Sequence, residues 1–76
     1  AVVEKKQLLS DGRHLKLTLR CKEASIDAIG FSMGEYSTLI GEGCSIDVAG
    51  SLDINVYRDR EYPQLIIKDI KRIRNT

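Results

Sequence analysis

The sequence has little of what marks an enzyme, a secreted domain or a metal-binding module. Among 76 residues there is no tryptophan, and there are one histidine, one phenylalanine, one proline and two cysteines. The two cysteines, Cys21 and Cys44, lie too far apart for a metal knuckle and are too few for a disulfide framework. Each stands where a strand pattern requires an apolar residue. We therefore expect both to be buried thiols in a reducing compartment.

Long hydrophobic runs are absent too. No apolar segment approaches the roughly 18 residues that cross a membrane, and no signal-peptide pattern is present. This predicts a cytoplasmic protein without a membrane partner. A chain this short buries only about 60% of the surface that its unfolded form exposes, too little for an enzyme core and a second module. It opens at Ala1 directly in strand-like sequence, so we expect residues 1–76 to be one domain excised from a longer protein.

A strong excess of either charge is also missing. The formal net charge is +1, which argues against a polybasic nucleic-acid binder. The order of the charges is more informative than their sum. From Arg13 to Lys22 there are four basic residues plus His14 and no acid, whereas from Glu23 to Tyr57 there are six acids and no lysine or arginine. This segregation predicts a domain with a basic side and an acidic side.

The clearest pattern present is a long hairpin between Cys44 and Ile70. Apolar and polar residues alternate along its first half, as in a strand with one buried face. The residues expected to face inward are Cys44, Ile46, Val48, Leu52, Ile54 and Val56.

Two features define this hairpin further. Gly50 stands in the inward register without a side chain, which predicts a bulge or bend. The polar run 58–61 makes the turn. The register expected from this turn pairs Tyr57 with Tyr62, Asn55 with Gln64, Ile54 with Leu65 and Leu52 with Ile67.

The segment His14–Cys21 is the strand with the least ambiguous phase. It alternates strictly between apolar and polar residues. The inward residues are Leu15, Leu17, Leu19 and Cys21, and the outward residues are His14, Lys16, Thr18 and Arg20.

The rest of the chain completes a small all-β domain. Residues 2–9 form a strand in one of two phases, with Val3 and Leu9 or Val2 and Leu8 inward, and an Asp-Gly turn follows. Residues 25–31 form a third strand with Ile29 and Phe31 inward. A short helix is expected over 35–40, between glycine breakers. Five strands with a helix between the third and fourth predict the five-stranded Greek-key barrel known as the OB-fold, with an SH3-like barrel as the alternative.

Four segments resemble a known family over nearly the whole chain. HLKLTL at 14–19, AIGF at 28–31, LDIN at 52–55 and QLIIKDI at 64–70 are similar to the OB-fold domain of RecJ proteins, single-strand-specific 5′ to 3′ DNA exonucleases of the DHH phosphoesterase superfamily. The sequence departs from that pattern at Asp59, where a turn glycine is common, and at Pro63, where leucine is common.

The resemblance implies a role beside catalytic domains. In that family the OB domain follows the catalytic domains and helps to hold single-stranded DNA, in DNA repair and recombination. The divalent metal, manganese or magnesium, and its Asp and His ligands belong to catalytic motifs that this sequence lacks. The resemblance thus implies no cofactor here and no cleavage of DNA by this domain alone.

Single-strand binding requires cations for phosphates and flat side chains on which bases stack. In OB-folds the nucleic-acid face is built from the second and third strands and the neighbouring loops. A solvated strand face with a polar hairpin tip is the alternative interpretation. The candidate nucleic-acid residues are His14, Lys16, Thr18, Arg20, Tyr57, Arg58, Arg60 and Tyr62.

Other residues have simpler structural interpretations. Tyr57 and Tyr62 can also form a cross-strand aromatic pair. Asn55 and Gln64 are expected to bond each other across the hairpin. Phe31 is expected in the core, with a stacking platform as the lesser alternative. A catalytic triad around His14 is disfavoured, because neighbours on one turn lack converging geometry.

Three functional hypotheses remain open. The first is a single-stranded DNA-binding module of a RecJ-like nuclease. The second is a structural domain that packs against and orients the catalytic domains through the acidic side, residues 23–53. The third is an RNA-binding barrel.

Overall fold

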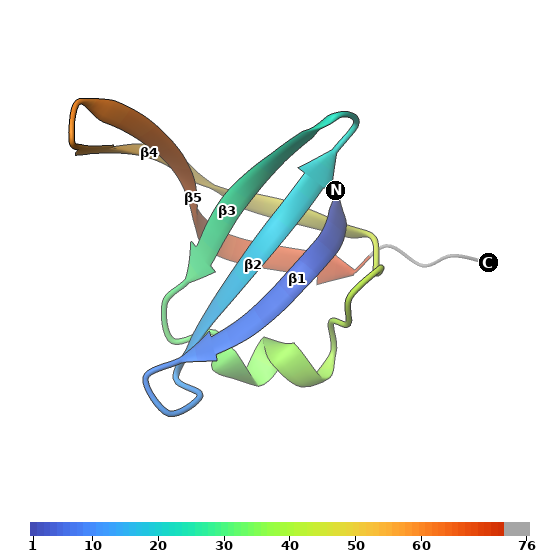
Figure 1. Ribbon diagram of the computed structural model, residues 1–76. Coiled ribbons are helices and arrows are strands. Elements are labelled where there is room, and N and C mark those ends of the chain that lie inside the picture. The colour runs from blue at the N-terminus through green and yellow to red at the C-terminus, as the bar shows by residue number, and fades with distance from the viewer. Residues whose placement is uncertain (73–76) are drawn as a thin grey trace.

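The computed structural model describes residues 1–72, of which Arg72 is described by its backbone alone, and shows five strands and one short 3₁₀-helix (Figure 1). The expectation that Ile73 and Arg74 prolong the last strand lies outside the described residues. The elements are β1 (Val2–Leu9), β2 (His14–Cys21), β3 (Ala24–Gly30), the 3₁₀-helix η1 (Gly34–Thr38), β4 (Ile46–Tyr57) and β5 (Arg60–Arg72).

The strands form one sheet in the order β1-β2-β3-β5-β4, which curls into a barrel. All neighbouring strands are antiparallel except β3 and β5, which are parallel. The backbone NH of Val3 donates to the carbonyl of Cys44 (2.9 Å), and that of Ile46 to the carbonyl of Ala1 (2.8 Å). These bonds close the barrel between the starts of β1 and β4. The topology is the predicted OB-fold, with the expected helical turn between the third and fourth strands.

The core is centred on the inward face of β2. Leu15, Leu17 and Leu19 are fully buried, as the alternation predicted. They pack with residues contributed by the other elements. These are Val3, Ala28, Met33, Ile40, Ile46, Ile67 and Ile70.

The predicted phase of β3 is wrong. Ala28 and Gly30 face the core, opposite Leu17 and Leu15, while Ile29 lies on the outer face. The space beneath this end of β3 is filled by Met33, whose sulfur would lie 2.8 Å from a Cβ added at Gly30. Only small residues fit there. Phe31, expected in the core, is consequently 54% exposed.

Strand β1 changes face at a bulge. Val3 is buried opposite Leu19, and the register then shifts between Val3 and Lys5. Beyond the bulge Leu8 takes the inward register opposite Leu15, while Lys5 points outward beside Thr18. Of the residues predicted to face inward, Val3 is buried, whereas Leu8 stands in the inward register but is 45% exposed, and Val2 is also exposed.

The expectation of two buried thiols is wrong for Cys21. This residue is exposed, because the buried positions of β2 end at Leu19 and Cys21 adjoins the turn into β3. Cys44 is half-buried and packs against the core. Neither cysteine forms a disulfide.

Strands β4 and β5 form the long hairpin, with a register two residues away from the predicted one near the turn. The turn contains only Arg58 and Asp59, with φ of 52° and 62°, so Tyr57 pairs with Arg60. Positive φ at both positions is the signature of a type I′ turn. The pairs along the hairpin are Asn55 with Tyr62, Ile54 with Pro63, Asp53 with Gln64, Leu52 with Leu65 and Gly50 with Ile67.

The bulge predicted at Gly50 is confirmed. The register shifts between Ala49 and Gly50, where β5 carries the additional residue Lys68. A Cβ at Gly50 would collide with the carbonyl oxygen of Ile66. Glycine at this position thus lets the two strands stay paired where the hairpin bends.

The outer part of the hairpin, residues 52–63, projects from the barrel as an arm (Figure 1). Strand β3 pairs with β5 from Gln64 to Ile66, so among the described residues no strand continues the sheet beside the arm at Pro63. Leu52, Ile54 and Val56 were expected inward but are 62%, 51% and 70% exposed. Their alternation defines a face of the strand correctly, but no other element within residues 1–72 covers that face.

Candidate nucleic-acid interface

The outward row on β2 lies where the sequence places it. His14, Lys16 and Thr18 are half-buried and Arg20 is exposed, all on the side of the strand opposite the buried leucines. The strict alternation of β2 holds them there, because a shift by one residue would turn the leucines to solvent. These four side chains follow one another along the middle of the sheet's outer face.

Two partners hold His14 at one end of this row. Its Nδ1 accepts a hydrogen bond from the backbone NH of Ser32 (2.9 Å). Its ring also meets that of Phe31 edge to face, with centroids 5.4 Å apart. Phe31 therefore presents an exposed aromatic ring on the outer face and does not pack in the core as expected.

A shallow pocket of about 190 Å³ opens on the same face. It is bordered by Lys5, Gln7, Lys16, Thr18 and Asp27, and also by Lys6. Sequence reasoning missed Lys5 and Gln7, because the bulge in β1 conceals which of its residues share the face of β2. An alternation restarted after Glu4 would have found both.

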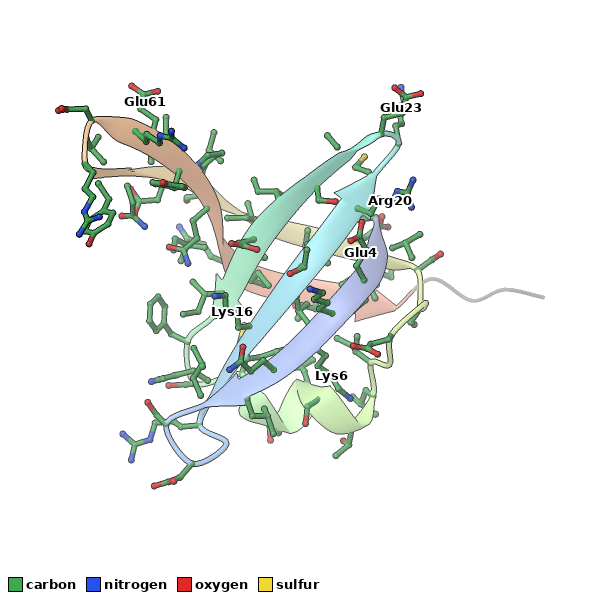
Figure 2. All side chains as sticks on the ribbon, viewed as in Figure 1. Glu4, Lys6, Lys16, Arg20, Glu23 and Glu61 are labelled. Carbon is green, nitrogen blue, oxygen red and sulfur yellow. The ribbon has the colours of Figure 1, made fainter. Side chains whose placement is uncertain are left out.

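Lys6 has a different role from its neighbour Lys5. Its Nζ donates to the carbonyl oxygens of Ser37 (2.7 Å) and Ile40 (2.9 Å). In Figure 2 its side chain runs toward the helix η1, away from Lys16. Its ammonium group thus satisfies carbonyls at the end of η1.

Acidic side chains also enter the outer face. Thr18 Oγ1 donates to Asp27 Oδ1 (3.4 Å), and Arg20 Nε lies 3.9 Å from Glu4 Oε1 on the neighbouring strand (Figure 2). Such an exposed ion pair contributes little and is readily exchanged for another anion. The basic character of this face is therefore concentrated at Lys5, Lys16 and Arg20.

The other predicted residues lie at the tip of the arm. Tyr57 and Tyr62 are exposed and share one face, but they are diagonal neighbours and not the directly opposed pair that was predicted. The Arg58 guanidinium carbon lies 5.3 Å from the centre of the Tyr57 ring, a cation–π contact. Arg60 is exposed opposite Tyr57.

The bond expected between the two amides is present. Asn55 Nδ2 donates to Gln64 Oε1 (3.3 Å) across one diagonal of the arm. It forms despite the shifted register, because diagonal side chains on one face remain within reach. This bond ties the two strands of the arm together below the tyrosines.

One continuous face connects the barrel row with the arm. Cross-strand partners share a face of a sheet, and two rows of partners cross all five strands. The first row is Gln7, Lys16, Ile29, Ile66 and Ser51, and the second is Lys5, Thr18, Asp27, Gln64 and Asp53. The arm extends this face outward, so the tyrosines and the barrel cations lie at different ends of the same surface.

The surface is open, and the pocket on it is shallow. Within residues 1–72, no three His, Cys, Asp or Glu side chains come together in a way that could hold a metal ion. In the same part of the chain no helix has the length and apolarity needed to cross a membrane.

Fold and surface together define an OB-fold domain whose outer face carries cations, acids and exposed aromatic rings. The chain belongs to the RecJ OB domain family, whose sequence model matches residues 1–69. It is also 39% identical over 56 residues to the curated single-stranded-DNA-specific exonuclease RecJ of Bacillus subtilis (strain 168). That match covers 74% of this chain and 7% of the Bacillus protein, so the chain corresponds to a small part of that relative.

Proposed function

We propose that this chain is the single-stranded DNA-binding module of a RecJ-like exonuclease and has no catalytic activity by itself. The supporting observation is the outer face that joins Lys5, Lys16 and Arg20 to exposed aromatic rings on a RecJ-family OB barrel. Cations and flat rings on one open surface are the two elements that single-strand binding without sequence preference requires.

In this proposal the barrel cations hold the phosphates. Lys5 and Lys16 border the same pocket, and Arg20 gives up its weak contact with Glu4. Each phosphate contact contributes about −0.7 to the slope of log K against log salt for a single strand. Three contacts give a slope of about −2.

The aromatic side chains stack on the bases. Phe31 serves the barrel end of the face, while Tyr57 and Tyr62 serve the arm, with His14, Thr18, Arg58 and Arg60 as hydrogen-bond donors beside them. Each stack contributes roughly 1 to 3 kcal/mol and tolerates any base. A duplex keeps its bases stacked inside, so it offers phosphates but no bases to these rings. A preference for single strands follows.

The remaining parts of the function would lie elsewhere in a longer cytoplasmic polypeptide. We take the 76 residues to be one of its domains, beside catalytic domains of the DHH type that hold manganese or magnesium and cut DNA during repair and recombination. This chain's contribution is to keep the strand in place while the catalytic domains cut it.

A titration tests the proposal directly. The 76-residue chain is titrated with fluorescent single-stranded DNA, duplex DNA and RNA of equal length at two salt concentrations. We expect binding to single-stranded DNA that weakens with salt and exceeds binding to the duplex. Preference for RNA would favour an RNA-binding barrel, and binding to none of the three would favour a domain that only packs against its neighbours.

A further inference from the structure

The arm has two faces of opposite chemistry. One, the tyrosine face, carries Asn55, Tyr57, Arg60 and Tyr62 and continues the candidate nucleic-acid interface. The other, the apolar face, consists of Leu52, Ile54, Val56 and Pro63. The apolar face is the outward continuation of the barrel interior, since Leu52 pairs with Leu65, which packs against the core.

The exposure of the apolar face is unusual for so small a domain. Its three β4 residues follow one another on one side of the strand, and each is more than half exposed. Scattered apolar residues are normal on a protein surface, but a contiguous patch marks an interaction site. Within residues 1–72 these side chains stay exposed, because the arm projects past the last pairing of β3 with β5.

Nucleic acid is a poor occupant for this face. It presents no aromatic ring for stacking and no cation for phosphate. Its charged neighbour is Glu61, the partner of Val56, which Figure 2 shows at the far part of the arm. The tyrosines and Arg60 lie on the opposite face, so the arm separates a surface suited to DNA from one suited to protein.

A second copy of the chain is also a poor occupant. A standard protein interface takes about 20 to 30 residues from each partner, and the apolar face offers only a few. A domain on the same polypeptide needs less area, because a tether raises its effective concentration, to the millimolar range when the tether is short. The match to the Bacillus relative covers 7% of that protein, which leaves ample chain for such a domain.

We infer that the apolar face docks onto an apolar patch of a neighbouring domain in the same polypeptide, while the tyrosine face stays open to DNA. This inference rests on the proposed function insofar as it takes the chain to be one domain of a longer protein. The arm then fixes the direction in which its tyrosine face points relative to that neighbouring domain.

Two adjacent positions on opposite faces provide the test. Val56→Cys places a thiol on the apolar face, and Tyr57→Cys places one on the tyrosine face. Both are made in a Cys21→Ser, Cys44→Ala background, once in the longer polypeptide and once in the 76-residue chain. Rates of maleimide labelling are measured with and without a single-stranded oligonucleotide, and thermal melts confirm that each variant is folded.

We expect position 56 to react at least about tenfold more slowly in the longer polypeptide than in the 76-residue chain, with position 57 unchanged, as tethered docking at millimolar effective concentration implies. Fast labelling of position 56 in both proteins overturns the inference. Protection of position 56 that grows with concentration of the 76-residue chain overturns it in favour of a second copy. Protection that appears only with the oligonucleotide overturns it in favour of nucleic acid.

The same experiment keeps the two proposals apart. Protection of position 57 by the oligonucleotide supports DNA binding on the tyrosine face. If position 57 stays reactive with the oligonucleotide while position 56 is protected without it, docking stands and the tyrosine face is removed from the proposed DNA site.

Discussion

Lys5 and Lys6 are neighbours in sequence but serve opposite sides of β1. Both residues border the outer-face pocket beside Lys16, but the Lys6 ammonium is directed away from it and donates to the carbonyl oxygens of Ser37 and Ile40. One lysine is thus available to a ligand and the other supports the fold. This difference provides a matched pair of variants for the proposed phosphate contacts.

Lys5→Gln and Lys16→Gln should each weaken single-strand binding and flatten its salt slope by about 0.7, since one fewer counterion is released. Lys6→Gln removes the same charge from the chain but should leave the slope unchanged. It should instead lower the free energy of unfolding by up to about 1 kcal/mol, the usual net contribution of a hydrogen bond. Titrations at several salt concentrations and urea unfolding measure both effects. Equal slopes for all three variants would contradict the assignment of Lys5 and Lys16.

Phe31→Leu tests stacking at the barrel end of the face. The change keeps an apolar side chain but removes the aromatic ring, so binding of single-stranded DNA should fall by about 1 to 3 kcal/mol with an unchanged salt slope. Leu39→Ala, at another exposed apolar residue beside η1, is the control and should bind as the parent does. Affinity equal to the parent's in a folded Phe31→Leu variant would leave Phe31 as a partner of His14 only.

Asp59→Gly should stabilise the arm. Asp59 has φ of 62°, a conformation that costs an L-residue roughly 1 kcal/mol and glycine almost nothing. We expect the free energy of unfolding to rise by about 0.4 to 1 kcal/mol. Asp59→Ala, which lacks both the freedom of glycine and the local bonds of aspartate, should lower it. The opposite order of the two variants in thermal melts would be incompatible with a type I′ turn.

The stability of Gly→Ala variants should distinguish glycines in crowded positions from a glycine in an open one. A Cβ at Gly50 would collide with the Ile66 carbonyl and one at Gly34 with the Gly12 carbonyl, whereas one at Gly41 would meet nothing within 4 Å. Gly50→Ala and Gly34→Ala should therefore each cost at least about 2 kcal/mol of stability. Gly41→Ala should be nearly neutral. Chemical unfolding curves of the three variants give the comparison.

The two thiols should react at different rates. Cys21 is exposed and should be modified rapidly by a maleimide under native conditions, while half-buried Cys44 should react more slowly until the domain unfolds. Mass spectrometry of the time course, followed by peptide mapping, assigns each modification. Slow modification of Cys21 would instead support the prediction from the sequence that its thiol is buried.

Strand β2 shows what the sequence can predict. Its alternation fixes Leu15, Leu17 and Leu19 inside, and with them the outward direction of Lys16 and Arg20. The number of strands and their order along the chain followed from similar patterns. A strand with one buried face specifies its own register, so the central part of the candidate site was predictable.

Strand β3 shows where such patterns fail. Ile29 and Phe31 are the more hydrophobic residues, but Met33 fills the space beneath Gly30, and the residues of β3 that face the core there are Ala28 and Gly30. That constraint comes from a residue outside the strand. The outward position of Lys5 was missed for a similar reason. It depends on the bulge in β1, and the residue composition does not show where an extra residue is inserted.

The arm shows that an alternating pattern can define one face of a strand without showing whether another element buries that face. The alternation of Leu52, Ile54 and Val56 places them correctly on one side of β4, but whether they are buried depends on what lies beyond the strand. The register near the tip was missed because the predicted turn was centred on Asp59 and Arg60, whereas the chain turns at Arg58 and Asp59.

The position of Pro63 bears on how this domain behaves at high concentration. The edge of β5 is unpaired there, just past its last contact with β3, and an open edge is a template on which stray strands add and aggregates grow. Proline has no NH to donate, so a strand that added at this point would lose a hydrogen bond at its first step. Pro63 thus protects the β5 edge of the arm against the edge-to-edge polymerisation that its exposed aliphatic residues would otherwise favour.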